Sequence, residues 1–130
     1  MLCLGTISDA VLRRKAIIRS IKANYGLGRY ERVIQISEEH ADNDDCKDWL
    51  MKAKKRIAEQ EEGMYDWFET FRAADDQKPN ARPDVAEYRG PVEVRERKGE
   101  PGVRGVFATR DVNIGELLVC FRWDSYLVWS

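Results

Sequence analysis

A stretch without hydrophobic periodicity divides this chain into a helical part and a β-rich part. It covers residues 73–86, AADDQKPNARPDVA, and contains Pro79 and Pro83. Proline lacks a backbone donor and restricts the residue before it, so the stretch disfavours both a helix and a central strand. We therefore predict a helical region over residues 1–72, a linker over 73–86 and a β region over 87–130. This order of elements predicts the α+β fold class.

Two amphipathic helices joined by a glycine turn are predicted first. The first begins near Ala10, after a cap at Ser8 or Asp9, and ends at Gly26-Leu27-Gly28, where glycine permits a helix stop. Its apolar residues lie within one arc of about 120°: Ala10, Val11, Ile17, Ile18, Ile21 and Tyr25. The second begins at Arg29 or Tyr30 and has residues at helical spacing: Tyr30, Val33, Ile34, Ser37 and Ala41. Together they predict an αα-hairpin.

Two further helices are expected before the linker. The third follows the capping cluster Asn43-Asp44-Asp45 and continues to Gly63, with apolar residues at helical spacing: Cys46, Trp49, Leu50, Ala53 and Ile57. Its charged residues are interpreted as a solvated face: Lys52, Lys54, Lys55, Arg56, Glu59, Glu61 and Glu62. The fourth is a short aromatic helix whose stripe consists of Met64, Trp67, Phe68 and Phe71. We expect this stripe to need a partner.

The β region is predicted to form a small antiparallel meander. Residues 92–95 alternate as a half-buried strand does, residues 96–101 form a polar turn, and residues 106–108 form a short apolar run. The segment DVNIGE, residues 111–116, is typical of a tight turn in which Gly115 takes a positive φ. The run from Leu117 to Phe121 is apolar at both alternating positions, which predicts a strand covered on both faces.

The motifs of the β region occur in the same order as those that open a SET domain, and the region resembles this fold of S-adenosylmethionine-dependent protein lysine methyltransferases. That family has a glycine-arginine-glycine type loop, a strand beginning Leu-Phe-Ala and an Asp-Val-x-x-Gly-Glu turn. The matching residues are Arg104, Gly105, Val106, Phe107, Ala108, Thr109, Arg110, Asp111, Val112, Gly115 and Glu116. The resemblance implies cofactor contact at Arg104, Gly105 and Val106. Val103 replaces the first glycine, so Gly102 takes that role in one interpretation, and the β-branched side chain argues against close cofactor contact.

The helical region carries a second resemblance. Leu27-Gly28-Arg29-Tyr30, followed by Val33 and Ile34, resembles the middle of a tetratricopeptide repeat (TPR). With the segment GMYDWF, it makes residues 10–121 similar to the fungal TPR-containing SET proteins. Only one repeat is evident, and a single hairpin does not bury its own apolar face, so a protein partner is expected at these helices.

The resemblance also sets an expectation about activity. Family members continue into an Asn-His segment and a late tyrosine, whereas Phe121 is followed here only by RWDSYLVWS. His40 is interpreted as a solvated histidine, and we assign no catalytic residue. We expect a truncated, inactive SET-domain protein, with a TPR-like interaction module as the alternative. The apolar ending and the unfinished sheet predict self-association.

Charge, cysteine content and hydropathy narrow the possible partners, sites and cellular compartments of this protein. Lys and Arg number 22 against 23 Asp and Glu, and acids interleave with the arginines of the β region, so neither nucleic acid nor a membrane is expected as a partner. Cys3, Cys46 and Cys120 are odd in number and lack CxxC pairing, which argues against a disulfide framework or a metal site. Nothing resembles a secretory signal or a span of about 20 apolar residues. These features predict an intracellular protein, cytoplasmic or nuclear.

Overall fold

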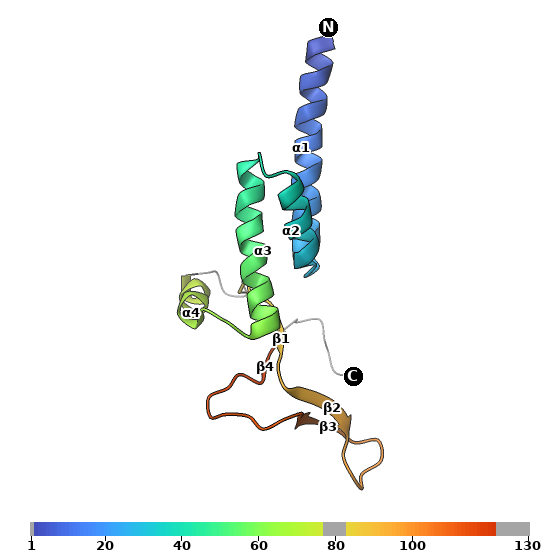
Figure 1. Cartoon of the computed structure of the whole chain (residues 1–130), viewed down its shortest axis with the longest axis vertical. Coiled ribbons are helices and arrows are strands. Elements are labelled where there is room, and N and C mark those ends of the chain that lie inside the picture. Colours follow the sequence, from blue (N-terminus) through green and yellow to red (C-terminus); the bar gives the residue numbers. More distant parts are fainter. Residues whose placement is uncertain (1, 77–82, 122–130) are drawn as a thin grey trace. The chain divides into compact units, whose positions relative to one another are not determined.

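The computed structural model describes residues 2–76 and 83–121 and has the predicted α+β class (Figure 1). Within these residues, four helices precede four short strands. The chain divides into two compact units, residues 1–57 and residues 58–130, and each has its own packing. The limits predicted for the helical region, the linker and the SET-like part stay a prediction. Part of that linker, residues 77–82, and the apolar ending, residues 122–130, lie outside the described residues.

The first unit opens with the predicted αα-hairpin. Helix α1 spans Leu2–Gly26 and helix α2 spans Tyr30–Glu39, and the two pack against each other. Gly28 takes a φ of +74° in the turn, as its position predicts, and its N–H donates to the Tyr25 carbonyl at 3.0 Å. The start of α1 was predicted wrongly, because no proline interrupts the segment after Leu2 and the two candidate caps, Ser8 and Asp9, lie inside the helix.

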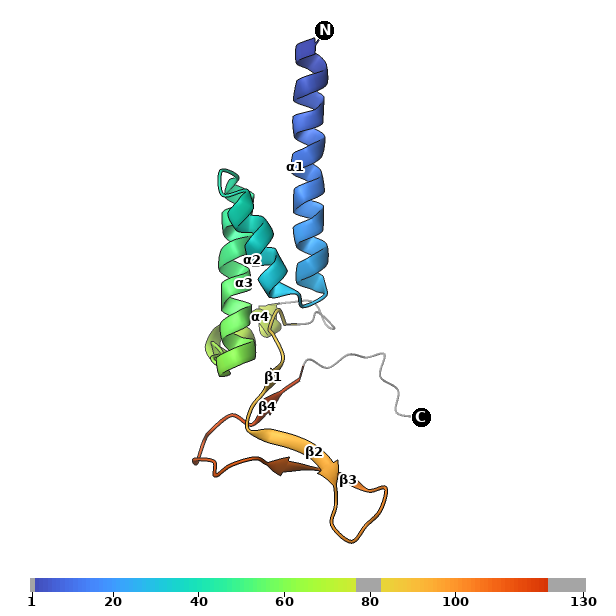
Figure 2. The ribbon, with the colours of Figure 1, turned by 45° about the vertical axis from the view of Figure 1, so that its right-hand side comes forward.

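The apolar arc of α1 is buried only near its C-terminal end. Ile21 is fully buried and Tyr25 is half-buried, whereas Val11 keeps 48% of its surface exposed. The cause is length: α2 has 10 residues against 25 in α1, and Figure 2 shows the first turns of α1 running beyond α2. Tyr25 packs edge-on against Tyr30 at 5.3 Å and against Trp49 at 5.1 Å between ring centroids.

Helix α3 spans Asp44–Glu62 and begins at the predicted cap. The Asn43 side-chain oxygen accepts the N–H of Asp45 at 3.0 Å and a hydrogen bond from the Arg14 guanidinium at 3.1 Å. The helix ends before Gly63, which has a φ of +66°. Cys46 and Ala53 are buried as the spacing predicts.

One interpretation of α3 is wrong. Arg56 and Glu59 were assigned to the solvated face, yet their exposed fractions are 5% and 1%. Both follow Ala53 at intervals of three residues, so they lie close to the buried stripe of the helix. For Glu59 there is also a specific partner, because its carboxylate accepts the backbone N–H of Ala86 at 2.8 Å. A buried carboxylate is retained where such a hydrogen bond compensates its lost hydration.

Helix α4 spans Trp67–Asp76 and is the short aromatic helix that the sequence predicts, except that Met64 lies before the helix and not in its stripe. Asp66 caps it, because its carboxylate accepts the N–H of Glu69 at 2.9 Å. The aromatic side chains of α4 stay largely exposed, with Phe68 at 79% and Phe71 at 65% of their surfaces. In the described part of the chain no helix is long and apolar enough to cross a bilayer.

The strands of the second unit form two antiparallel pairs in place of one continuous meander. Strand β2 pairs with β3, and strand β1 pairs with β4. Their bounds are Tyr88–Arg89 for β1, Val92–Glu96 for β2, Arg104–Ala108 for β3 and Val119–Cys120 for β4. The last run of the β region joins β1 because the N–H of Gly90 donates to the Leu118 carbonyl at 2.9 Å. A Cβ at Gly90 would lie 2.8 Å from that oxygen, so only glycine permits this approach.

The run after Gly115 is less covered than its composition predicts. Only two of its residues are in a strand, and Leu118 and Val119 expose 38% and 37% of their surfaces. Phe121 exposes 71%. Coverage on both faces is therefore wrong for the described residues, because the neighbours Leu118 and Val119, which point to opposite faces, both keep more than a third of their surfaces exposed.

Candidate functional site

The hairpin of β2 and β3 contains the residues that the SET resemblance selects. Its strands pair over five positions, and Arg104, Gly105 and Val106 face Glu96, Arg95 and Val94. The loop between the strands has two residues in the left-handed region, Gly99 at +83° and Gly102 at +81°. The residue beside Val103 with a positive φ is thus Gly102, as one interpretation of the loop requires.

The three candidate cofactor residues are brought together, but in a strand. The resemblance to SET domains implies a loop at Arg104 and Gly105, whereas both residues belong to β3. Side chains of a strand alternate between its faces, and Gly105 is half-buried while Val106 exposes 67% of its surface. Arg104 is exposed as well, so the three residues do not share one side-chain face.

Gly105 has a packing role within the hairpin. A Cβ at this position would lie 3.1 Å from the ring of Phe107 and 3.4 Å from Cγ of Arg97. The missing side chain leaves room for the Phe107 ring, over which the Arg95 guanidinium lies at 4.3 Å from the centroid. Such a cation–π contact stabilises the hairpin by about 0.5–1 kcal/mol at an exposed site. Glycine at position 105 is therefore explained by contacts inside the chain.

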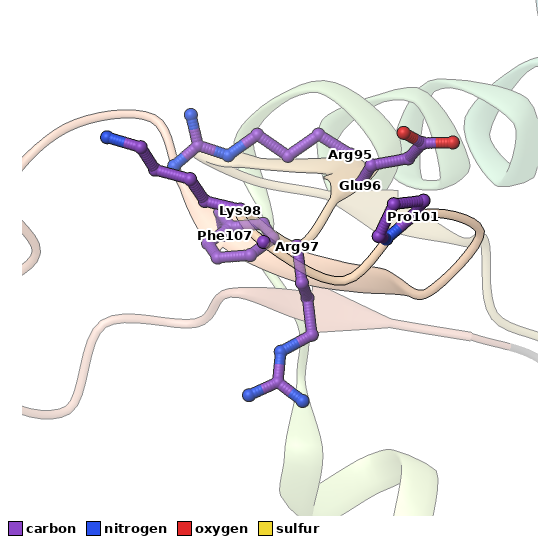
Figure 3. A pocket seen from close by; sticks show the side chains of 7 residues that line it. Arg95, Glu96, Arg97, Lys98, Pro101 and Phe107 are labelled. Atoms are coloured by element: carbon purple, nitrogen blue, oxygen red, sulfur yellow. The ribbon is translucent and has the colours of Figure 1, made fainter.

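A hollow of about 490 Å³ lies at the loop end of the hairpin (Figure 3). Its lining consists of Arg95, Glu96, Arg97, Lys98, Gly99, Pro101 and Phe107. Figure 3 shows Arg95 and Lys98 extending along the Phe107 side, whereas Arg97 points away. Two of these cations are partly neutralised, since Arg95 lies 3.5 Å from the Glu93 carboxylate and Arg97 lies 3.1 Å from that of Glu100.

None of the three candidate cofactor residues lines this hollow. The interleaved acids of the β region predict a mixed-charge surface at the arginines of this hollow and do not indicate a site. The available signal was the run Arg95-Glu96-Arg97-Lys98 beside a polar turn, which places three long cationic side chains at one end of a hairpin.

The DVNIGE turn is held by one acidic side chain. The Glu116 carboxylate forms an ion pair with the Arg110 guanidinium and accepts the N–H of Asn113 at 3.0 Å. These two hydrogen bonds lower the pKa of Glu116 below its ordinary value, and the bond from Arg110 is the larger cause. The same bond raises the pKa of Arg110 further. Gly115 has the predicted positive φ, +82°. The ion pair joins residues six apart across the turn, a spacing that no periodic pattern reveals.

In residues 2–76 and 83–121, no three His, Cys, Asp or Glu side chains are grouped so that they could hold a metal ion. Cys46 is buried, and this burial, followed by the nearby charges of Asp45 and Asp42, raises the pKa of its thiol. A thiol with a raised pKa is a poor nucleophile at neutral pH.

Comparison with known proteins gives one informative match. No family model and no solved structure matches the chain. Over 123 residues the chain is 28% identical to a protein named methyltransferase from the fungus Gibberella zeae. The match covers 92% of this chain and 16% of that protein, so the chain spans about one sixth of the length of this relative. The match supports a relationship between this chain and a methyltransferase-named protein.

Proposed function

We propose that these residues form the helical leader and the first strands of a SET-type, S-adenosylmethionine-dependent protein lysine methyltransferase. The observation that carries the proposal is the match over 123 residues to a methyltransferase-named protein. The motif order from Arg104 to Glu116 supports the SET assignment, and the turn that closes this motif has a defined structure built on the Arg110–Glu116 ion pair.

The described residues do not by themselves enclose S-adenosylmethionine. In the proposed family this cofactor supplies the methyl group, and the backbone matching Arg104–Val106 contacts it. Here those residues belong to an exposed two-stranded hairpin, and Val106 exposes 67% of its surface. Methyl transfer needs the donor and the lysine amine in line within about 3–3.5 Å. We therefore propose that this chain alone is inactive in methyl transfer.

A chimera tests this proposal. The chain would replace the matching region of the Gibberella protein, and methyl transfer from radiolabelled S-adenosylmethionine to histone lysines would be measured. The chimera is expected to transfer methyl groups and the isolated chain is not. Turnover by the isolated chain contradicts its inactivity, and a folded but inactive chimera beside an active parent contradicts the family assignment.

A matched pair of glycine variants sharpens the experiment. In the chimera, Gly102→Val is expected to reduce the rate about tenfold, because a β-branched residue at positive φ costs on the order of 1–3 kcal/mol. The control is Gly26→Ala, because Gly26 is not among the glycines with positive φ and a Cβ there meets nothing within 4 Å. Equal rates for the two variants would show that the loop geometry is irrelevant to the activity.

The alternative function is a TPR-like protein-interaction module without enzymatic activity. The observation that favours it is a hollow of about 330 Å³ on α1, lined by Arg14, Lys15, Ile18, Arg19, Lys22 and Asp45. Four cations beside one acid favour an acidic peptide. Binding of a fluorescent Glu/Leu peptide should weaken in Arg19→Glu and with salt, but not in Lys54→Glu on the exposed face of α3. Unchanged binding in Arg19→Glu would reject this surface.

A further inference from the structure

The strongest unexplained feature is a row of exposed aromatic side chains around α4. The aromatic face, defined by Trp67, Phe68 and Phe71, repeats at helical spacing within α4. Trp67 exposes 43% of its surface, Phe71 65% and Phe68 79%. Large apolar side chains scattered singly on a surface need no explanation, but a contiguous group of them marks an interaction site.

The aromatic face has a fixed geometry. Trp67 lies between two other rings, with Tyr65 stacked at 4.8 Å and 20° and Phe71 at 6.2 Å and 28°. The hydroxyl of Tyr65 donates to the Ala86 carbonyl at 2.5 Å, which anchors this end of the row to the segment before β1. The cap at Asp66 fixes the first turn of the helix. A preformed row of this kind loses little entropy when it binds.

The residues that neighbour the aromatic face in the sequence are mostly acidic. Residues 61–75 contain one basic residue, Arg72, and five acids whose side chains are exposed: Glu61, Glu62, Asp66, Glu69 and Asp75. Aromatic rings attract cations through their negative faces, and carboxylates around them add to this attraction. The same field repels acidic peptides and nucleic acid. The surface therefore fits a cationic partner that also has apolar side chains.

We propose that the aromatic face of α4 binds a Lys- and Arg-rich amphipathic segment of a partner protein. The apolar side chains of that segment pack on Phe68 and Phe71, and its cations lie over the rings and against the flanking carboxylates. Phe68 and Phe71 expose 79% and 65% of their surfaces, so the face is open to such a segment. This inference goes beyond the proposed function and does not depend on methyl transfer.

The test uses a fluorescein-labelled helical peptide of leucine and lysine, titrated with the whole chain and followed by anisotropy. The matched peptide has glutamate at every lysine position. The lysine peptide is expected to bind at least about tenfold more tightly, and 0.5 M salt should weaken it, because exposed charges are screened over a few ångströms at that concentration. Equal binding of the two peptides would overturn the proposal.

Two variants locate the binding on the chain. Phe68→Ser and Phe71→Ser should each weaken the lysine peptide about tenfold, as buried aromatic anchors do at interfaces. The control is Phe121→Ser, because Phe121 is equally exposed at 71% but lies after β4. Circular dichroism verifies that each variant keeps its helices.

The other occupants would give different results. If a second copy of this chain covers the face, light scattering detects a dimer that Phe68→Ser dissolves and the lysine peptide does not bind, which overturns the proposal. Loss of binding in Phe121→Ser to the same extent as in Phe71→Ser would overturn it as well.

Discussion

The end of α3 and the whole of α4 differ in which side chains they bury. Glu59, a carboxylate, exposes 1% of its surface, whereas Phe68 in the next helix exposes 79%. Glu59 is buried beside a specific partner, because its carboxylate accepts the N–H of Ala86 at 2.8 Å. A charged group is buried where a hydrogen bond offsets its desolvation, and an aromatic group stays exposed where nothing packs on it. In this chain hydropathy alone does not decide which residues lie inside.

The largest expected effect comes from removing the buried carboxylate. Glu59→Ala leaves the N–H of Ala86 without its acceptor and should lower the free energy of unfolding by about 2–3 kcal/mol. Urea unfolding followed by circular dichroism measures this change. Glu62→Ala, in the exposed last turn of α3, is the control and should change it by less than about 0.5 kcal/mol. Equal effects would mean that Glu59 is not specifically held.

Tyr65 links the buried contact at Ala86 with the exposed aromatic row of α4. Its hydroxyl donates a hydrogen bond to the Ala86 carbonyl, and its ring stacks on Trp67. Tyr65→Phe removes only the hydrogen bond and should cost about 1 kcal/mol of unfolding free energy. The same unfolding experiment measures it. Combined with Glu59→Ala, the loss should differ from the sum of the single losses, since both groups bond one residue. Strict additivity would contradict a shared role at Ala86.

Glu116 is a half-buried acid whose carboxylate pairs with Arg110 and accepts the N–H of Asn113. Its pKa is lowered in the folded chain, so its contribution to stability is present above the ordinary glutamate value of about 4.3 and is lost as pH falls through the folded pKa. A carboxyl NMR titration measures the midpoint. Arg110→Ala should return it toward the ordinary value. An unchanged midpoint in this variant would rule out the guanidinium as the main cause.

The smallest expected effect on stability is at the aromatic face. Phe68→Ser should change the free energy of unfolding by less than about 0.5 kcal/mol, because the ring is exposed and buries little surface within the chain. The solubility of the chain should rise at the same time. A precipitation titration measures it, with Phe121→Ser as the control. A loss above about 2 kcal/mol, the scale of a buried aromatic, would show that the ring belongs to a core.

Local signals in the sequence predict the local structure of this chain. The stop at Gly26, the cap at Asn43 and the left-handed residue at Gly115 each depend on nearby residues, and each is found. The burial of Glu59 depends on Ala86, 27 residues later, and the pairing of β4 with β1 depends on the approach of Gly90 to Leu118. Contacts at that separation leave no periodic pattern in the sequence.

The candidate site shows the same limit. The motif order selects Arg104, Gly105 and Val106, and they are adjacent in space because they are adjacent in sequence. The cross-strand contacts of the hairpin were not predicted: Arg95 lies over Phe107, and Gly105 leaves room for that ring. These contacts require the register of β2 against β3, which depends on the geometry of the turn between them as well as on the hydrophobic pattern.

The pairing of β1 with β4 has a consequence for how this region tolerates change. Gly90 and Leu118 are joined by a hydrogen bond, so the chain between them leaves and returns at one place. The entropy of closing such an excursion grows slowly, by about 0.6 kcal/mol for each doubling of its length. Insertions in the loop between β2 and β3 should therefore be inexpensive as long as Gly90 is kept. The length of the loop in this hairpin can therefore change at little cost in stability, whereas a side chain at position 90 would collide with the Leu118 carbonyl oxygen.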